Sequence, residues 1–278
     1  MKKSITFFYT TLIILFTIST KAQTATEFAD SATNKAKGGN LEDAILLYNK
    51  AIELNPNYAE AYHNRGLSFS ALENDTAAFA DFSKAIKLFS NSNAPEIEWS
   101  YANRGNILLK YEQYEYAAED FKQAIQVNPS SYIIYNKLAL CYANLGDDSL
   151  AMNCFDSSLA INKDFQQTYY YKGAFYIKLK QDLKAIECFD KAIIIDSLYE
   201  SAYFQRGMAK VGVELYREAI IDFDKVISFS GEDGTYYLAR GLAYAFLLDT
   251  KKACEDFEQA KKFGEAEKAE EYIAEYCK

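Results

Sequence analysis

Four arginines in this chain of 278 residues are each followed, sixteen residues later, by an aspartate. Guanidinium and carboxylate groups form strong two-pronged ion pairs, so the spacing predicts a structural pair within each segment. Common ancestry of the four segments would explain the spacing without any contact. Where the arginine is replaced, at Ser31, Leu138 and Lys172, the acid is missing too. The predicted pairs are Arg65 with Asp81, Arg104 with Asp120, Arg206 with Asp222 and Arg240 with Asp256, and we do not interpret them as an anion site.

The five cysteines could form disulfides but have no partners for binding a metal. His63 is the only histidine and no CxxC pair occurs, so a zinc site is not expected. We interpret Cys154 and Cys188 as small buried hydrophobic residues. Cys254 and Cys277 would meet if the last two helices pack antiparallel, and a bridge there would contribute roughly 3 kcal/mol. Spacing alone does not decide whether they are bridged.

Catalytic motifs are missing from the sequence. It contains no nucleophile elbow, no Walker sequence and no GxGxxG. With one histidine and no metal-binding cluster, we expect a protein that is not an enzyme and that needs no cofactor. The formal net charge is -9, so the basic surface that binds nucleic acid is not expected either.

Two series of aromatic residues repeat along the chain with the same period. Successive members lie 34 residues apart, with a single step of 39. A repeat of this length indicates a unit that buries its apolar face only by stacking on its neighbours. The early series is Phe28, Tyr62, Tyr101, Tyr135, Tyr169, Tyr203 and Tyr237, and the late series is Tyr48, Phe82, Phe121, Phe155, Phe189, Phe223 and Phe257.

Small residues at fixed places within each repeat predict a pair of helices. Glycine or alanine follows the early aromatic by four residues, and an alanine comes twelve residues after that. Glycine inside a helix costs about 1 kcal/mol relative to alanine, so its recurrence needs a compensating contact. We expect the two helix backbones to approach closely at the glycine, with the late aromatic filling the space where they diverge. Pro56 and Pro129 end units because proline stops a helix.

The pattern resembles the tetratricopeptide repeat from residue 25 to about residue 265. In the third unit the matching residues are Tyr101, Gly105, Leu108, Ala117, Phe121, Ala124 and Pro129. The resemblance implies an all-α fold: a right-handed α-solenoid of helix–turn–helix units in one continuous superhelix, with a C-terminal capping helix over 266–277. The predicted units are about 25–58, 59–97, 98–131, 132–165, 166–199, 200–233 and 234–265.

Residues 1–22 have the pattern of a secretory signal peptide. Lys2 and Lys3 precede an apolar run of about 14 residues, and small residues stand at the expected cleavage point after Ala22. A membrane anchor is the alternative, although the run is shorter than the roughly 20 residues of a spanning helix. We therefore expect an exported protein, periplasmic or secreted, with a bacterial envelope favoured and no membrane span after signal removal.

The resemblance also implies where a partner binds. In the family the inner face is built from positions 2, 5, 9 and 12 of each first helix, and in this chain these positions carry almost no charge. An uncharged, partly apolar face predicts a protein or peptide partner; tight supercoiling that buries the same residues is the alternative. The candidate residues are His63, Trp99, Asn106, Asn136, Tyr170, Phe204, Met208, Val211, Leu238 and Leu242.

Three functions are compatible with this pattern. We favour a non-catalytic scaffold of the cell envelope that binds a protein or peptide. A structural component of an envelope assembly or secretion complex, docking by its outer surfaces, is the second, and a carrier of apolar small molecules is the third. Some members of the family clamp a peptide's terminal carboxylate with lysine or arginine, and such residues are missing from the inner positions of this chain.

Overall fold

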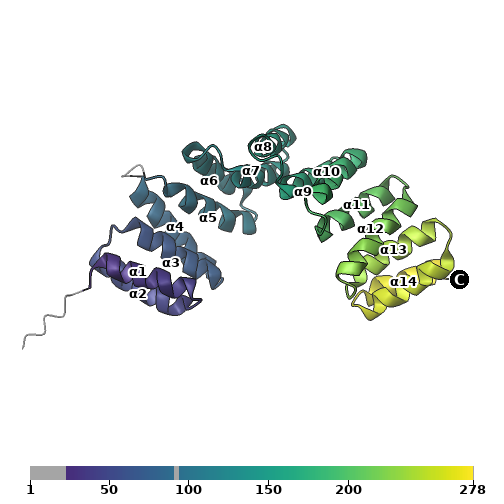
Figure 1. The fold of residues 1–278 in the computed structure, drawn as a ribbon, viewed down its shortest axis with the longest axis horizontal. Coiled ribbons are helices and arrows are strands. Elements are labelled where there is room, and N and C mark those ends of the chain that lie inside the picture. Colours follow the sequence, from purple (N-terminus) through teal and green to yellow (C-terminus); the bar gives the residue numbers. More distant parts are fainter. Residues whose placement is uncertain (1–22, 91–93, 278) are drawn as a thin grey trace, which may run out of the picture. The chain divides into compact units, whose positions relative to one another are not determined.

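The computed structural model describes residues 23–90 and 94–277, and every regular element in these ranges is an α-helix. The predicted signal peptide, residues 1–22, lies outside the described residues. The first fourteen helices form seven consecutive pairs (Figure 1). The prediction of an all-helical repeat fold with a capping helix is therefore confirmed.

Each pair has a first and a second helix. The first helices are α1 (Ala25–Lys37), α3 (Ala59–Ala71), α5 (Ile97–Lys110), α7 (Tyr132–Leu145), α9 (Gln166–Lys178), α11 (Glu200–Gly212) and α13 (Gly234–Phe246). The second helices are α2 (Leu41–Leu54), α4 (Asp75–Phe89), α6 (Tyr114–Val127), α8 (Asp148–Ile161), α10 (Asp182–Ile195), α12 (Tyr216–Phe229) and α14 (Thr250–Lys262), and the capping helix is α15 (Ala266–Tyr276). None of these helices combines the length and the hydropathy needed to span a bilayer.

The chain divides into two compact units, one up to Lys84 and one from Ala85 onward. In the second unit, α5 to α14 pack as successive pairs, and each second helix contacts the first helix of the next pair. Neighbouring first helices also touch: α7 contacts α9, α9 contacts α11, and α11 contacts α13. The first unit has the same pairing among α1, α2 and α3. One continuous right-handed superhelix through all repeats stays a prediction.

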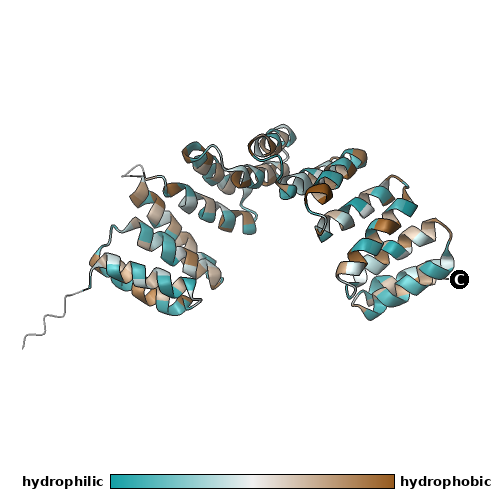
Figure 2. Ribbon diagram, in the orientation of Figure 1, coloured by the Kyte–Doolittle hydropathy of each residue, from teal (hydrophilic) through white to brown (hydrophobic). Residues whose placement is uncertain are grey.

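The late aromatic rings form the centre of this packing. Tyr48 is 1% exposed and the six phenylalanines of the series are 0% exposed. The hydroxyl of Tyr48 lies 2.9 Å from Thr33 Oγ1, which satisfies the one polar atom among these rings. Hydrophilic and hydrophobic residues alternate around the helices (Figure 2), as expected when one side of each helix is buried.

The glycines of the first helices make room for these rings. A methyl group placed on Gly173 would lie 2.7 Å from the edge of the Phe189 ring, and Gly207 has the same relation to Phe223 at 2.6 Å. We expected glycine to let two helix backbones approach closely, and that approach stays a prediction; the atoms nearest to the added methyl group belong to the ring. The ring edge itself lies on the glycine, because a helix turn without a Cβ atom leaves a flat surface there.

The capping helix α15 covers the apolar end of the last pair. Its Ala269 is completely buried in the cluster that includes Phe257 and Ala260 of α14. The rings of Tyr272 and Tyr276 lie 5.4 and 6.2 Å from the Phe257 ring. A terminal repeat has no further neighbour, so a helix with one apolar side is needed to keep its face from water.

Candidate functional site

All four arginine–aspartate pairs are present, and each joins the two helices of one repeat. Arg206 Nε and Nη2 donate to the two carboxylate oxygens of Asp222 at 3.0 and 2.5 Å. The other three pairs have the same two-pronged geometry, with distances of 2.7–2.8 Å. The four aspartates are only 1–6% exposed. A carboxylate this deeply buried needs its cation, so the pairs are part of the core.

The structure adds a contact that was not predicted from the sequence. Arg206 Nη1 also donates to Asp190 in the second helix of the preceding repeat, at 2.6 Å. In the fifth repeat Lys172 takes the place of arginine and contacts Asp156 of the repeat before it, at 2.5 Å. Each of these acids lies sixteen residues before its cation, so a search in both directions along the sequence would have found it. The same contact joins Arg240 to Asp224 and Arg65 to Asn49.

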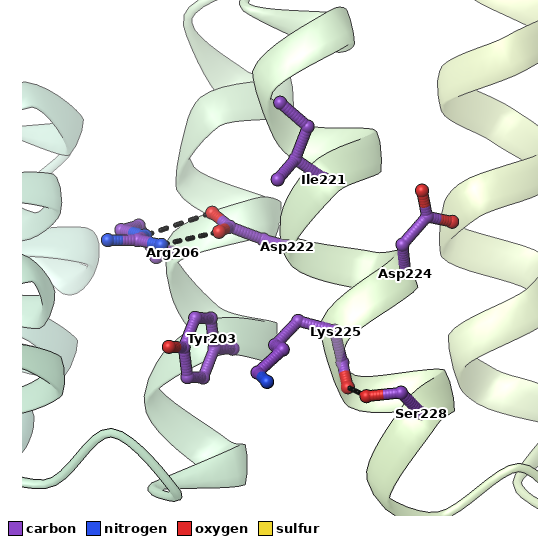
Figure 3. Close-up of a pocket in the computed structure, with 7 residues that line it drawn as sticks. All are labelled: Tyr203, Arg206, Ile221, Asp222, Asp224, Lys225 and Ser228. Carbon is purple, nitrogen blue, oxygen red and sulfur yellow. Dashed lines mark hydrogen bonds and ion pairs between the residues drawn. The ribbon is translucent and has the colours of Figure 1, made fainter.

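Each of these arginines also lies against the early tyrosine of its repeat. The guanidinium of Arg206 is 5.3 Å from the centre of the Tyr203 ring. Hydrogen bonds to Asp120 and Asp256 raise the pKa of Arg104 and Arg240 respectively. A cavity of about 410 Å³ lies beside the Arg206–Asp222 pair, lined also by Tyr203, Ile221, Asp224, Lys225 and Ser228 (Figure 3). Because Arg206 is already held by two carboxylates, it links repeats and is not placed to hold an anion.

Cys254 in α14 and Cys277 at the end of α15 form a disulfide, with their Cα atoms 5.9 Å apart. The other three cysteines are free and buried. Burial raises the pKa of Cys141 to about 12 and that of Cys154 to about 11. Such thiols stay protonated at neutral pH and are poor nucleophiles. Within the described residues no group of acids, histidines and cysteines is arranged to hold a metal ion.

Removal of the disulfide is expected to free the C-terminal end of the chain. The variant with Cys254→Ser and Cys277→Ser loses the cross-link that closes a loop of 23 residues. We expect the free energy needed to open α15 to fall by roughly 3 kcal/mol. Hydrogen exchange of the α15 amides measures this loss. Reduction of the wild-type protein should reproduce it, and the reductant should leave the variant unchanged. Equal protection of α15 in the variant and the oxidised wild type would contradict the prediction.

The exposed side of the first helices is rotated from the predicted one. Counted from the start of each predicted unit, positions 2 and 13 are exposed in every first helix from α3 to α13, whereas positions 5 and 12 are half-buried or buried. Positions 2, 6, 9 and 13 follow one side of a helix. For α5 to α13 we call these residues the first-helix face: Trp99, Asn103, Asn106, Lys110, Ile133, Lys137, Leu140, Asn144, Gln167, Tyr171, Ala174, Lys178, Ser201, Gln205, Met208, Gly212, Thr235, Ala239, Leu242 and Phe246.

The rotation corrects the set of candidate groove residues. His63, Asn136 and Leu238 are 7%, 3% and 6% exposed, so they belong to the core. Tyr170, Phe204 and Val211 are half-buried, at positions that turn toward neighbouring helices. The physical reason is that position 5 faces the next repeat. Of the ten candidates, those that lie on the first-helix face are Trp99, Asn106, Met208 and Leu242.

The contacts of position 5 show how repeats are joined. The Tyr170 ring lies 5.2 Å from the ring of Tyr199, the residue that immediately precedes α11. The Phe204 ring lies 5.2 Å from the ring of Tyr236 in α13. In the fourth repeat Asn136 takes this position. Its Nδ2 donates to Thr168 Oγ1 of the fifth repeat at 2.8 Å, and its Oδ1 is buried without a hydrogen-bond partner among the described atoms. These residues are therefore buried or half-buried against neighbouring helices.

His63 is expected to make the protein less stable in mild acid. Burial lowers the pKa of His63 from 6.5 to about 4, so the unfolded chain binds the proton more readily than the folded one. The free energy of unfolding therefore has its full value above about pH 6.5 and falls as the pH drops toward 4. At pH 5 it should be about 2 kcal/mol lower than at pH 7. Urea unfolding at pH 7 and pH 5 measures the difference. The control His63→Asn copies the residue of the fourth repeat and should remove this part of the pH dependence; an unchanged difference would contradict the assignment.

The first-helix face is apolar in part and carries only positive charge. Trp99 is 56% exposed, Ile133 and Phe246 are each 46% exposed, and Met208 is 43% exposed. Its charged residues are Lys110, Lys137 and Lys178, and it contains no carboxylate. These lysines were not among the predicted groove residues, because the family pattern follows positions 5 and 12. The helical spacing of i, i+4, i+7 and i+11 from the exposed position 2 would have found them.

The sequence matches family models of the tetratricopeptide repeat. A model described as "TPR repeat" matches residues 35–73, and two described as "Tetratricopeptide repeat" match residues 99–131 and residues 59–92, 132–165 and 166–197. Together these matches cover more than half of the chain. The chain therefore belongs to the tetratricopeptide repeat proteins.

Relatives and solved structures agree with this assignment. The "Small glutamine-rich tetratricopeptide repeat-containing protein 2" of Mycosarcoma maydis is 31% identical over 106 residues, which are 38% of this chain and 29% of the relative. This chain thus spans less than a third of that relative's length. The C-terminal part of a TPR repeat-containing protein from Cytophaga hutchinsonii is 19% identical, with a TM-score of 0.70 over 86% of this chain and 95% of that one. YrrB, described as "a TPR protein with an unusual peptide-binding site", is 26% identical, with a TM-score of 0.56 over 64% of this chain and 89% of YrrB.

Proposed function

We propose that this protein is an exported, non-catalytic scaffold that binds a peptide segment of a partner protein on the first-helix face. The observation that carries the proposal is the mostly uncharged first-helix face, in a chain that is 25% charged. Its side chains are exposed at positions 2 and 13 and mostly half-buried at positions 6 and 9, where Ala239 is buried. Large exposed apolar residues on one face are typical of a partner site, and an exposed tryptophan is the kind of residue that dominates binding energies. The similarity to YrrB, whose description names a peptide-binding site, supports the same assignment.

Export is the second part of the proposal. The N-terminal pattern of residues 1–22 motivates it. The disulfide between Cys254 and Cys277 supports it, because disulfides persist in oxidising compartments outside the cytosol. Processing of the N-terminus during expression in a bacterial host tests this part: mass spectrometry should find the mature chain starting at Gln23. Recovery of the unprocessed chain in the membrane fraction would favour the anchor instead.

A selection from a random peptide library tests the binding face. Peptides that bind the purified wild-type chain should bind Ile133→Asp and Met208→Asp variants at least tenfold more weakly, because each change places a charge against an apolar contact. Trp99 is the only tryptophan, so a shift of its fluorescence reports occupation of the face. Unchanged affinity in both variants, with no shift of Trp99 emission, would overturn the proposal.

The matched control lies on a second helix. Ile194 of α10 is 82% exposed, and Leu183 on the same helix is 65% exposed. Ile194→Asp should therefore leave peptide binding and stability unchanged. If Ile194→Asp weakens binding while Met208→Asp does not, docking through the outer surfaces becomes the better function.

A further inference from the structure

The charges of the second compact unit are segregated between its first and second helices. Each second helix from α6 to α14 carries two or three carboxylates. The five first helices, α5 to α13, together carry two, Glu98 and Glu200, and both are held in the first turn of their helix. Asn128 Nδ2 donates to Glu98 at 3.1 Å, and Tyr236 Oη donates to Glu200 at 2.7 Å. The residues of the first-helix face themselves therefore include no acid. Carboxylates of other elements lie close to the face: Asp182 of α10 lies beside Gly212, and Glu265 accepts a hydrogen bond from Thr235 at 3.5 Å.

The positive charges on the first helices fall into two groups. Those of the first group, which include Arg206, Lys210 and Arg240, pair with aspartates of the second helices. In the second group, on the first-helix face, Lys137 donates to Asn106 Oδ1 at 2.5 Å and Lys178 donates to the backbone carbonyl of Ala143. Both of these partners are neutral. Neither contact therefore compensates the charge of its lysine.

Lys137 is the more informative of the two. It is half-buried on α7, and its hydrogen bond to Asn106 links α7 to α5. Burial lowers the pKa of Lys137, since a cation that has lost water and gained only an amide is destabilised. Lys178 stabilises the C-terminal end of α7, where a positive charge is favourable without any ligand. A carboxylate brought to Lys137 would restore the lost interaction and form a charge-assisted hydrogen bond.

We infer that the partner segment is acidic as well as apolar, and that an aspartate or glutamate side chain of it pairs with Lys137 while apolar side chains contact Met208 and Leu242. The inference rests on the proposed function. Charge complementarity supports it, because the charged residues of this face are lysines, and Lys137 donates its hydrogen bond to a neutral partner. The face extends on both sides of Lys137, over α5 and over α9 to α13. A segment that runs through it presents side-chain carboxylates and does not need a free C-terminus.

The test uses peptides selected on the wild-type chain, resynthesised with acetylated and amidated ends. We expect aspartate or glutamate to be enriched among them, and their replacement by asparagine or glutamine to lower the affinity roughly tenfold. Lys137→Gln should lower the affinity by a similar factor and remove its dependence on salt, whereas Lys137→Arg should retain both. The control Lys251→Gln removes an exposed lysine of α14 and should have no effect.

The outcomes separate this inference from the proposed function. If the selected peptides contain no enriched acid, or bind Lys137→Gln as well as wild type, while Met208→Asp still abolishes binding, the acidic partner is refuted and the binding face stands. If amidation of the C-terminus abolishes binding, the carboxylate recognised is terminal and the inference is refuted as well. If neither Met208→Asp nor Lys137→Gln changes the affinity, the proposed function itself fails.

Discussion

Replacement of Asp222 by alanine is expected to lower the free energy of unfolding by about 3–5 kcal/mol, the usual cost of leaving a buried cation without its partner. Asp222 is 1% exposed and accepts hydrogen bonds from both Arg206 and Lys210, at 2.5–3.0 Å. The loss should lie toward the lower end of the range, because Arg206 keeps its contact with Asp190. Urea denaturation of the full chain, followed by circular dichroism, measures the effect.

Asp224 provides the matched control on the same helix. It contacts Arg240, but its side chain is 53% exposed, and exposed pairs contribute only about 0–1 kcal/mol. Asp224→Ala should therefore lower the free energy of unfolding much less than Asp222→Ala does. Equal losses for the two variants would show that burial of the pair does not determine its contribution.

The apolar alternative to an ion pair already exists within the chain. The fourth repeat has Leu138 and Cys154 where the third has Arg104 and Asp120. Replacing both members of a buried pair by apolar residues is often neutral, whereas removing one is costly. The double change Arg104→Leu with Asp120→Cys should thus lower the free energy of unfolding less than Asp120→Ala alone does. This result would explain why the repeat tolerates either an ion pair or an apolar pair at these two positions.

The variant Phe189→Ala should show the second large effect: we expect its free energy of unfolding to be lower by about 3–5 kcal/mol. The ring is completely buried, its edge lies against Gly173, and the Tyr170 ring is 5.9 Å away. Glycine has no side chain that could move into the space, so the cavity should stay open. Thermal or urea unfolding of the full chain measures the loss.

Ile194→Ala on the same helix is the control for this change. Ile194 is 82% exposed, so its removal should change the free energy of unfolding by less than about 0.5 kcal/mol. If Phe189→Ala were no more destabilising than Ile194→Ala, the buried ring would not be the centre of the repeat's core.

Several features of the fold followed directly from residue spacing. The period of 34 residues predicted the helix pairs, since the two aromatic series recur in step. The ion pairs were visible as a spacing of sixteen residues because the two members stand at fixed places in each repeat. The contacts sixteen residues in the other direction, such as Arg206 with Asp190, were equally regular and were missed only because pairing was expected within a repeat.

The candidate face was less predictable. The family pattern placed His63, Asn136 and Leu238 on it, but the structure buries them against neighbouring helices. Whether such a residue is exposed depends on the angle at which the next repeat packs, and no single repeat contains that information. The lysines of the face were overlooked for a different reason: the family pattern follows positions 5 and 12, and these lysines stand at positions 6 and 13.

The sequence by itself determined the repeat, its helix pairs and the residues that could pair or bridge, because these depend on identity and order along the chain. Only the tertiary structure decided that Cys254 and Cys277 are joined, that one guanidinium links two repeats, and that positions 2 and 13 of the first helices from α3 to α13 face water. These features depend on how close neighbouring helices come and how they are rotated. That geometry results from the packing of many side chains at once.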